Sequence, residues 1–137
     1  MNHSFTYKFM PRFADIDSYS IAHHSKYFCW FEMARFHFMG EYLDLPLSTV
    51  HEFRSPVIRL GCEFNQPVLF GQEYTIETIV SYKLPKASLT FNYEIKNDSG
   101  QLIAKGFTEH VFLNSNNELM LSFPDIILRK MLSLQEV

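Results

Sequence analysis

The sequence is poor in cysteine, has no long apolar run and carries no block of basic residues. Its two cysteines, Cys29 and Cys62, form neither a disulfide framework nor a CxxC redox motif, so a reducing cytoplasm is the expected compartment. No apolar run approaches the roughly 18–20 residues of a membrane-spanning helix. Residues 1–11 lack the basic and apolar segments of a signal peptide. We therefore expect a cytoplasmic protein without a membrane span.

The balance of charge and the missing motifs exclude several kinds of site. The chain has 12 Lys and Arg residues against 15 Asp and Glu residues, and its formal net charge is −3. Because no basic cluster can neutralise several phosphates, nucleic acid is not an expected partner. The histidines match no metal-ligand spacing, and GxGxxG, GxxxxGK[ST] and GxSxG sequences are absent. The sequence thus predicts no metal, no cofactor and no serine-hydrolase elbow.

Aromatic residues are abundant, with 14 Phe and 7 Tyr among 137 residues. So many rings need a large core, a ligand cavity or a subunit interface in which to be buried. The length fits one domain, and neither a linker nor an internal repeat divides the chain. We expect a single domain over residues 1–137.

Residues 25–40 carry the clearest helical pattern. Apolar residues recur at intervals of three and four along one face, namely Tyr27, Phe31, Ala34 and Phe38. Further apolar residues cover much of the remaining surface, which predicts a helix buried on most sides, with Cys29 buried as an inert thiol.

The ends and charges of this helix are also predictable. Ser25 or a neighbouring histidine is suited to cap its start, and Gly40 is suited to end it. Glu32 and Arg35 lie three residues apart, a spacing at which they can form an ion pair.

Strand patterns flank this helix. They occupy residues 5–13, 57–64, 73–83, 88–96 and 102–113. Turns are expected at 97–100 and 114–118, a loop with at most one helical turn at 41–55, and a closing helix at 124–134. Consecutive hairpins favour an antiparallel sheet, and an apolar helix must pack on one of its faces. The prediction is an α+β fold, a curved antiparallel sheet wrapped around one long central helix.

Acidic and histidine side chains gather just before this helix. Asp15 and Asp17 are followed by His23 and His24, and the free N–H groups of the helix start lie close by. A carboxylate can attack a carbonyl carbon or take a proton from water, while a helix N-terminus polarises the carbonyl oxygen. Turn formation and helix capping explain such residues equally well, so both interpretations stand at this point.

Three stretches together resemble the front half of a hotdog-fold thioesterase. They are RFADID at 12–17, a histidine seven residues further at His24, and WFEMAR at 30–35, with Tyr27 between. The most similar branch is the 4-hydroxybenzoyl-CoA thioesterase-like family of small acyl-CoA thioesterases. The resemblance implies a hotdog fold, a homo-oligomer (dimer or tetramer) and hydrolysis of an acyl- or aryl-thioester of CoA or of an acyl carrier protein.

The resemblance also implies roles for individual positions. Asp17 matches the catalytic acid, as nucleophile or general base, and His24 matches the position whose backbone N–H faces the thioester carbonyl. Tyr27 matches a residue of the acyl pocket. Expected substrate-binding residues are Tyr19, Ser25, Tyr27, Phe28 and Phe31.

One departure from the family pattern concerns the turn after Asp17. Relatives commonly have a glycine two or three residues later, where this chain has Ser18, Tyr19 and Ser20. Two other hotdog activities therefore compete with hydrolysis. One is a non-hydrolytic module that binds an acyl chain or an acyl carrier protein, and the other is a dehydratase that uses His23 or His24.

Overall fold

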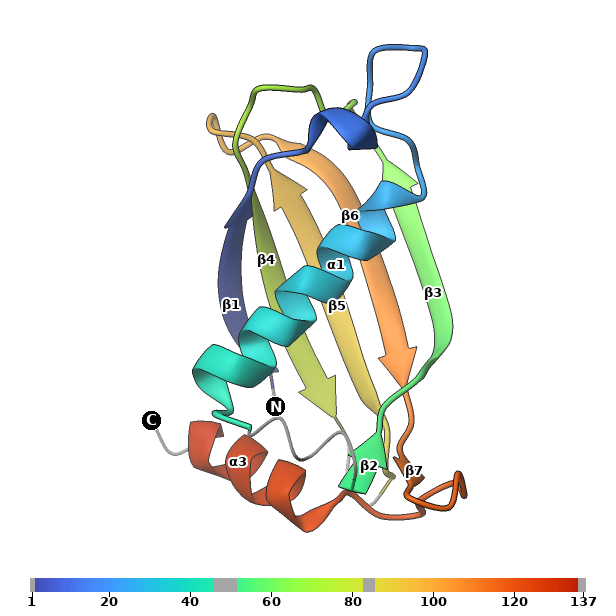
Figure 1. The fold of residues 1–137 in the computed structure, drawn as a ribbon. Helices are drawn as coiled ribbons and strands as arrows, with labels where there is room; N and C mark the ends of the chain where they lie inside the picture. The colour runs from blue at the N-terminus through green and yellow to red at the C-terminus, as the bar shows by residue number, and fades with distance from the viewer. Residues whose placement is uncertain (1, 46–51, 83–85, 136–137) are drawn as a thin grey trace.

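Five strands pair into one antiparallel sheet in a computed structural model that describes residues 2–45, 52–82 and 86–135. Their spatial order is β1-β4-β5-β6-β3, and every neighbouring pair is antiparallel. Their bounds are β1 Asn2–Phe9, β3 Val57–Phe64, β4 Tyr74–Tyr82, β5 Leu89–Lys96 and β6 Leu102–His110. One long helix, α1 (Lys26–His37), crosses a face of the curved sheet diagonally (Figure 1). The predicted α+β architecture is confirmed.

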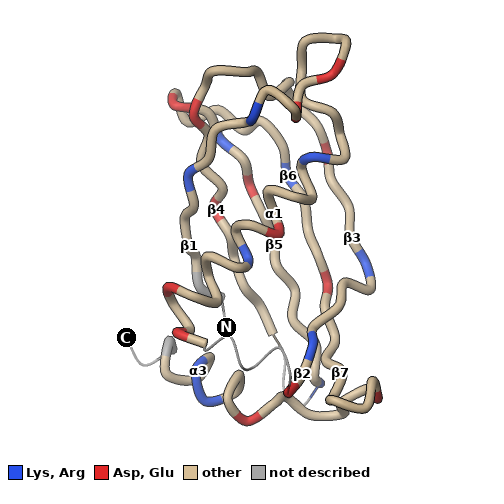
Figure 2. The backbone as a smooth tube through the Cα atoms, viewed as in Figure 1, with Lys and Arg blue, Asp and Glu red and all other residues tan. Residues whose placement is uncertain are grey.

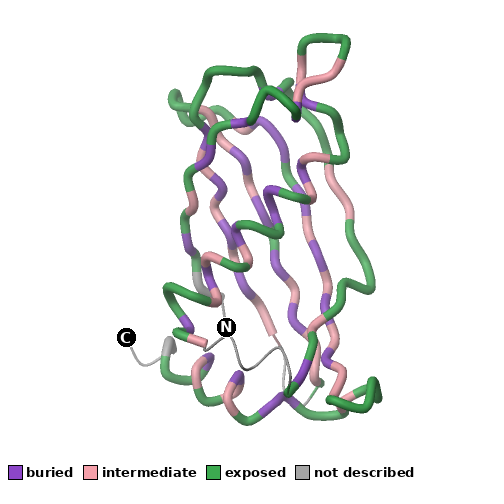
Figure 3. Tube along the Cα trace, in the orientation of Figure 1, coloured by how far each residue is buried: buried purple, intermediate pink, exposed green. Residues whose placement is uncertain are grey.

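The contact between α1 and the sheet forms much of the core. The four residues that share the predicted apolar face are all buried, namely Tyr27, Phe31, Ala34 and Phe38. The ring of Phe31 stacks on Tyr93 of β5, with centroids 4.3 Å apart and planes at 6°. Gly106 of β6 makes room for this ring, because a Cβ atom there would lie 2.6 Å from Phe31. Strands β4 and β5 alternate buried and less buried residues, as their sequence patterns predict (Figure 3).

The opposite side of α1 is exposed, so the prediction of burial on most sides is wrong for this chain. Phe36 is 63% exposed and Met33 is 47% exposed. Cys29 is also exposed, contrary to expectation. The number of apolar residues in 25–40 shows an unusually hydrophobic helix. A single sheet, however, covers only one face of a helix. An exposed apolar face therefore remains on α1.

The ends of α1 also differ from the prediction. After His37 a π-helical turn, η2 (Phe38–Tyr42), continues the chain past Gly40, so this glycine does not end the helix. Among the described residues, Glu32 and Arg35 form no ion pair, and Arg35 instead donates a hydrogen bond to the Tyr93 hydroxyl at 3.1 Å.

Strand boundaries follow the sequence closely with two corrections. β1 ends at Phe9 rather than at residue 13, in keeping with the missing N–H of Pro11. The expected strand 102–113 is divided, since β6 ends at His110 and β7 (Leu113–Asn114) pairs with β2 (Phe53–Arg54) in a second sheet.

The closing helix is present as α3 (Asp125–Gln135), in which Ile127 and Met131 are buried. The turn at 97–100 joins β5 to β6, and Gly100 adopts a φ of 80° there. Residues 46–51 of the expected loop lie outside the described residues. Basic and acidic residues are interspersed along the described chain (Figure 2).

Candidate active site

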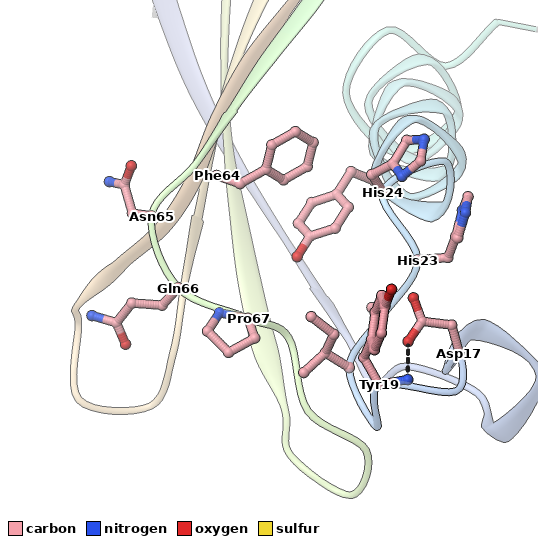
Figure 4. Close-up of a pocket in the computed structure, with 11 residues that line it drawn as sticks. Asp17, Tyr19, His23, His24, Phe64, Asn65, Gln66 and Pro67 are labelled. Atoms are coloured by element: carbon pink, nitrogen blue, oxygen red, sulfur yellow. Dashed lines mark hydrogen bonds between the residues drawn. The ribbon is translucent and has the colours of Figure 1, made fainter.

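A cavity of about 530 Å³ opens beside the start of α1. Figure 4 shows Asp17, Tyr19 and the two histidines on one side of it and the segment from Phe64 to Pro67 on the other. Its lining residues come from the loop before α1, the first turn of the helix and the end of β3, namely Asp17, Tyr19, Ile21, Ala22, His23, His24, Tyr27, Phe64, Asn65, Gln66 and Pro67.

A buried carboxylate anchors the loop that carries the site. Asp15 is 2% exposed, lies in a short helical turn, η1 (Phe13–Asp15), and accepts the backbone N–H of Arg12 at 2.8 Å. Its other oxygen lies 3.1 Å from the Arg12 guanidinium and 4.0 Å from Lys26 Nζ. Burial alone raises the pKa of Asp15, but the hydrogen bonds from Arg12 and the two positive charges outweigh it and leave the pKa below its usual value. Asp15 is therefore a structural anion.

Asp17 lies two residues further on, half-buried at the cavity wall. Its Oδ1 accepts the Tyr19 N–H at 2.8 Å, which fixes the side chain. Within the described residues its Oδ2 has no hydrogen-bond donor. The turn continues through Ser20, whose φ of 64° is the left-handed conformation that a glycine adopts without strain. A serine therefore adopts here a backbone conformation that favours glycine.

The start of α1 leaves one backbone donor open. The Lys26 N–H donates to the His23 carbonyl at 3.0 Å, and the Ser25 N–H donates to His23 Nδ1 at 3.2 Å. His23 thus caps the helix, whereas the Ser25 side chain makes no capping bond to it. In the described part of the chain the His24 N–H has no acceptor. The site therefore combines a carboxylate with an open donor at the positive end of a helix.

Aromatic residues form the inner wall. Tyr27 is 3% exposed, and its ring meets the edge of Phe64 with centroids 4.7 Å apart. Burial raises the pKa of the Tyr27 phenol, opposed by a hydrogen bond from the Val68 N–H, so the group stays neutral. Burial likewise raises the pKa of the neighbouring Cys62 thiol to about 11, which removes it as a nucleophile near neutral pH.

The structure brings together some of the residues expected at the site and separates others. Asp17, His24, Tyr19 and Tyr27 line the cavity, whereas Ser25, Phe28 and Phe31 do not. Phe31 is instead fully buried against Tyr93 in the core. The segment from Phe64 to Pro67 was missed, because only the pairing of β3 with β6 places it opposite the loop.

Neither a metal cluster nor a membrane-spanning helix is present in the described residues. No group of three or more His, Cys, Asp or Glu side chains there is arranged to hold a metal ion. No helix in the same residues is long and apolar enough to cross a membrane.

A curved sheet wrapped on a long helix, with an acid-and-histidine cavity at the helix start, defines a hotdog protein of the thioesterase type. The sequence profile of the thioesterase-like superfamily matches residues 11–131, and this chain belongs to that superfamily.

Individual relatives cover nearly the whole chain. A protein of Aquifex aeolicus (strain VF5), provisionally described as an esterase, is 29% identical over 130 residues, which span 90% of this chain and 94% of the relative. A gentisyl-coenzyme A thioesterase is 25% identical, with a TM-score of 0.79 over 90% of this chain and 99% of its own. A 1,4-dihydroxy-2-naphthoyl-CoA thioesterase from Synechocystis has a TM-score of 0.85 at 20% identity, over 97% of this chain and 98% of its own, a likeness of fold. The expected family and hotdog fold are confirmed, and thioester hydrolysis is the general class of reaction.

Proposed function

We propose that this chain hydrolyses acyl or aryl thioesters of coenzyme A in the cavity at the start of α1. The observation that carries the proposal is that Asp17 lines the same cavity as His24, whose N–H has no acceptor among the described residues. The related gentisyl-coenzyme A thioesterase supports CoA as the thiol. An acyl carrier protein thioester offers the same acyl–sulfur bond and is the second form of substrate.

In the proposed reaction the thioester oxygen points at the His24 N–H, where the helix end stabilises the negative charge that develops. Asp17 takes a proton from water while the water oxygen bonds to the carbonyl carbon. The C–S bond then breaks, the proton passes to the thiolate, and a free acid and a thiol leave. In the alternative route Asp17 itself bonds to the carbonyl carbon, and the C–S bond breaks so that the thiolate leaves and takes up a proton. Water then hydrolyses the resulting mixed anhydride, which releases the free acid and regenerates the Asp17 carboxylate.

The walls of the cavity suit this substrate. Tyr27 and Phe64 present rings to the acyl or aryl group, while Tyr19 is 82% exposed at the rim. The Tyr27 phenol adds a neutral polar group to this aromatic part of the wall.

The test is thiol release from short, long and aromatic acyl-CoA esters by the wild-type chain and by Asp17→Asn. We expect the variant to fold normally and to lose about 10²–10⁴-fold in kcat, the usual loss when a general base is removed. Asp98→Asn is the matched control, because Asp98 lies in an exposed turn between β5 and β6. Unchanged turnover in Asp17→Asn contradicts the assigned role.

Two variants at His24 separate the backbone donor from the imidazole. His24→Ala keeps the N–H and is expected to keep most of the activity. His24→Pro removes the N–H and is expected to lower kcat strongly. His24 precedes the first residue of α1, Lys26, so the substitution removes no hydrogen bond within the helix. A large loss in His24→Ala assigns the role to the side chain instead.

Three other outcomes distinguish the competing functions. Thiol release from an acyl carrier protein but from no CoA ester identifies the carrier protein as the substrate. Binding of acyl-CoA without turnover identifies a non-hydrolytic module. Hydration of an enoyl thioester that persists in Asp17→Asn identifies a dehydratase.

We also infer that the chain forms a homo-oligomer through β3. This strand lies at one edge of the sheet, and in the described residues no strand pairs with its outer side. Ile58 and Leu60 are each 51% exposed along it, next to the exposed apolar face of α1. An edge of this kind pairs readily with a second copy.

The mass in solution tests this inference. We expect Leu60→Lys to shift the wild-type oligomer towards monomer in light scattering after size-exclusion chromatography. Leu121→Lys is the control, because Leu121 is 85% exposed and lies away from β3 in the sequence and the sheet. A monomeric wild-type chain contradicts the inference.

A further inference from the structure

A second cavity, of about 540 Å³, lies at the far end of α1 and β3. It shares no lining residue with the cavity at the helix start. We call it the Arg35 cavity. Its lining includes Glu32, Arg35, Phe53, Arg54, Ser55 and His110. It borders the Val57 end of β3, whereas the first cavity borders the Phe64 end, roughly 23 Å away along an eight-residue strand.

A chain of hydrogen bonds runs from the core into this cavity, and its direction is fixed at both ends. His110 Nδ1 lies 3.0 Å from the Ser55 carbonyl, an acceptor, so Nδ1 carries the proton. In the neutral ring Nε2 then accepts from the Thr108 hydroxyl at 2.9 Å. Thr108 accepts in turn from the Tyr93 hydroxyl at 2.7 Å, and Tyr93 accepts from Arg35 at 3.1 Å.

Among the described residues, this series of hydrogen bonds holds Arg35 through one of its N–H donors. A guanidinium has five such donors, and among the described residues no carboxylate lies within ion-pair distance of Arg35. The other donors remain available on the cavity side of a half-buried side chain. A positioned cation with open donors is the usual partner of a carboxylate.

A second polar group in the wall lacks a partner among the described residues. The Ser55 hydroxyl oxygen is buried and makes no hydrogen bond to them, although Ser55 lines the cavity. A buried hydroxyl without a partner is costly, so a ligand atom that bonds to it gains affinity.

The net charge of the wall suits a monoanion. Arg35 and Arg54 are opposed by Glu32, while burial lowers the pKa of His110 and keeps that ring neutral. Phe53, which is 8% exposed, provides an apolar surface beside these polar groups.

We propose that the Arg35 cavity is a binding site for an organic monocarboxylate, with the carboxylate on Arg35 and the Ser55 hydroxyl and the hydrocarbon against Phe53. The carboxylate can belong to a free acid. It can also be the far end of a carboxyacyl thioester held by a second copy, because antiparallel pairing of two β3 edges sets the Val57 end of one beside the Phe64 end of the other.

The first arm of the test measures binding of octanoate by calorimetry, with octanamide as the uncharged match. We expect octanoate to bind roughly tenfold or more tightly than octanamide, and Arg35→Gln to remove most of that difference. Ser55→Ala is expected to weaken octanoate binding while raising the thermal stability, because it deletes an unpaired hydroxyl. A merely structural serine would not produce those opposite changes. Arg59→Gln is the control, since Arg59 of β3 pairs with Glu109 of β6 and does not line the cavity.

The second arm compares KM for octanoyl-CoA with KM for the CoA monothioester of octanedioic acid. If Arg35→Gln raises KM for the dicarboxylic thioester but not for octanoyl-CoA, the carboxylate bound in the Arg35 cavity is the far end of the acyl group. If octanoate binds but KM for the dicarboxylic thioester does not rise, the bound carboxylate belongs to a free acid. The second arm rests on the proposed hydrolysis, whereas octanoate binding is measured without it. Equal affinity for octanoate and octanamide, with no separation of the two KM values, overturns the proposal.

Discussion

The backbone carbonyl of Asp15 accepts the N–H of His23 at 3.0 Å, so the loop that carries Asp17 closes onto the start of α1. A bridge between Ile16 and Ala22 completes the closure. The buried carboxylate of Asp15 thus holds a loop whose next acidic residue faces the cavity. Two aspartates separated by one residue have different tasks because one is buried and paired and the other is half-buried and open.

Asp15→Asn tests the structural role of the buried carboxylate. We expect a loss of about 1–3 kcal/mol in the free energy of unfolding, because the amide cannot replace both the charge and the acceptor that Arg12 contacts. Urea denaturation measures the loss. Glu73→Gln is the control, because its pair with Lys8 spans 3.8 Å on the surface and is worth about 0–1 kcal/mol.

The same variant carries a pH signature. Since the folded-state pKa of Asp15 lies below its usual value of 3.8, its contribution is complete above that value and is lost as the pH falls through the folded-state pKa. In Asp15→Asn that part of the acid dependence is absent. If the free energy of unfolding falls equally with pH in the wild-type chain and in the variant, Asp15 is not the responsible group.

Ser20→Gly is expected to stabilise the protein. Ser20 has a φ of 64°, a conformation that costs an L-residue roughly 1–2 kcal/mol and a glycine very little. Part of the gain is offset by the greater freedom of glycine in the unfolded chain, which leaves about 0.5–1 kcal/mol. The difference in melting temperature between Ser20→Gly and the wild-type chain measures this gain in stability. Ser18→Gly is the control and is expected to destabilise, because Ser18 is not among the residues with positive φ.

The sequence predicted the helices and strands of this fold because its apolar residues recur at regular helical or strand intervals. β3 matches the predicted strand at 57–64 residue for residue. The four side chains predicted to share one helical face are all buried, three of them on α1 and Phe38 on η2. The exposure of Cys29 and the placement of Phe28 and Phe31 outside the cavity share one cause. Helical spacing tells which residues share a face, but the sheet decides whether that face meets the core, the cavity or solvent. The Arg35 cavity was not predicted at all. Its hydrogen-bonded groups include Ser55, Tyr93 and His110, which lie far apart in the sequence and come together only in the folded chain.

Gly106→Ala tests how closely α1 approaches the sheet. The added Cβ would lie 2.6 Å from the Phe31 ring and 2.8 Å from the Gly61 carbonyl oxygen, so the helix or the strand must shift. Such overpacking usually costs about 1–3 kcal/mol. Gly40→Ala is the control, since nothing lies within 4 Å of a Cβ there, and it is expected to be neutral or stabilising. Thermal unfolding of both variants decides, and an equally stable Gly106→Ala would contradict the close contact.

His110 is expected to make the protein less stable in mild acid. Burial lowers its pKa, opposed by the hydrogen bond to the Ser55 carbonyl and reinforced by the charge of Arg35. Above the usual value of 6.5 both the folded and unfolded states hold a neutral ring, so stability is unaffected. As the pH falls below 6.5 the unfolded chain takes up a proton that the folded ring does not bind, and the free energy of unfolding falls until the folded-state pKa is reached.

Protonation of Nε2 also turns this nitrogen from an acceptor into a donor towards Thr108, which breaks the series of hydrogen bonds that ends at Arg35. Urea curves between pH 7 and pH 5 measure the fall, and His110→Gln is expected to be less stable at pH 7 but to have a flatter dependence. If the two dependences are parallel, or if NMR titration of the ring gives a pKa at or above 6.5, the neutral tautomer assigned to His110 is wrong.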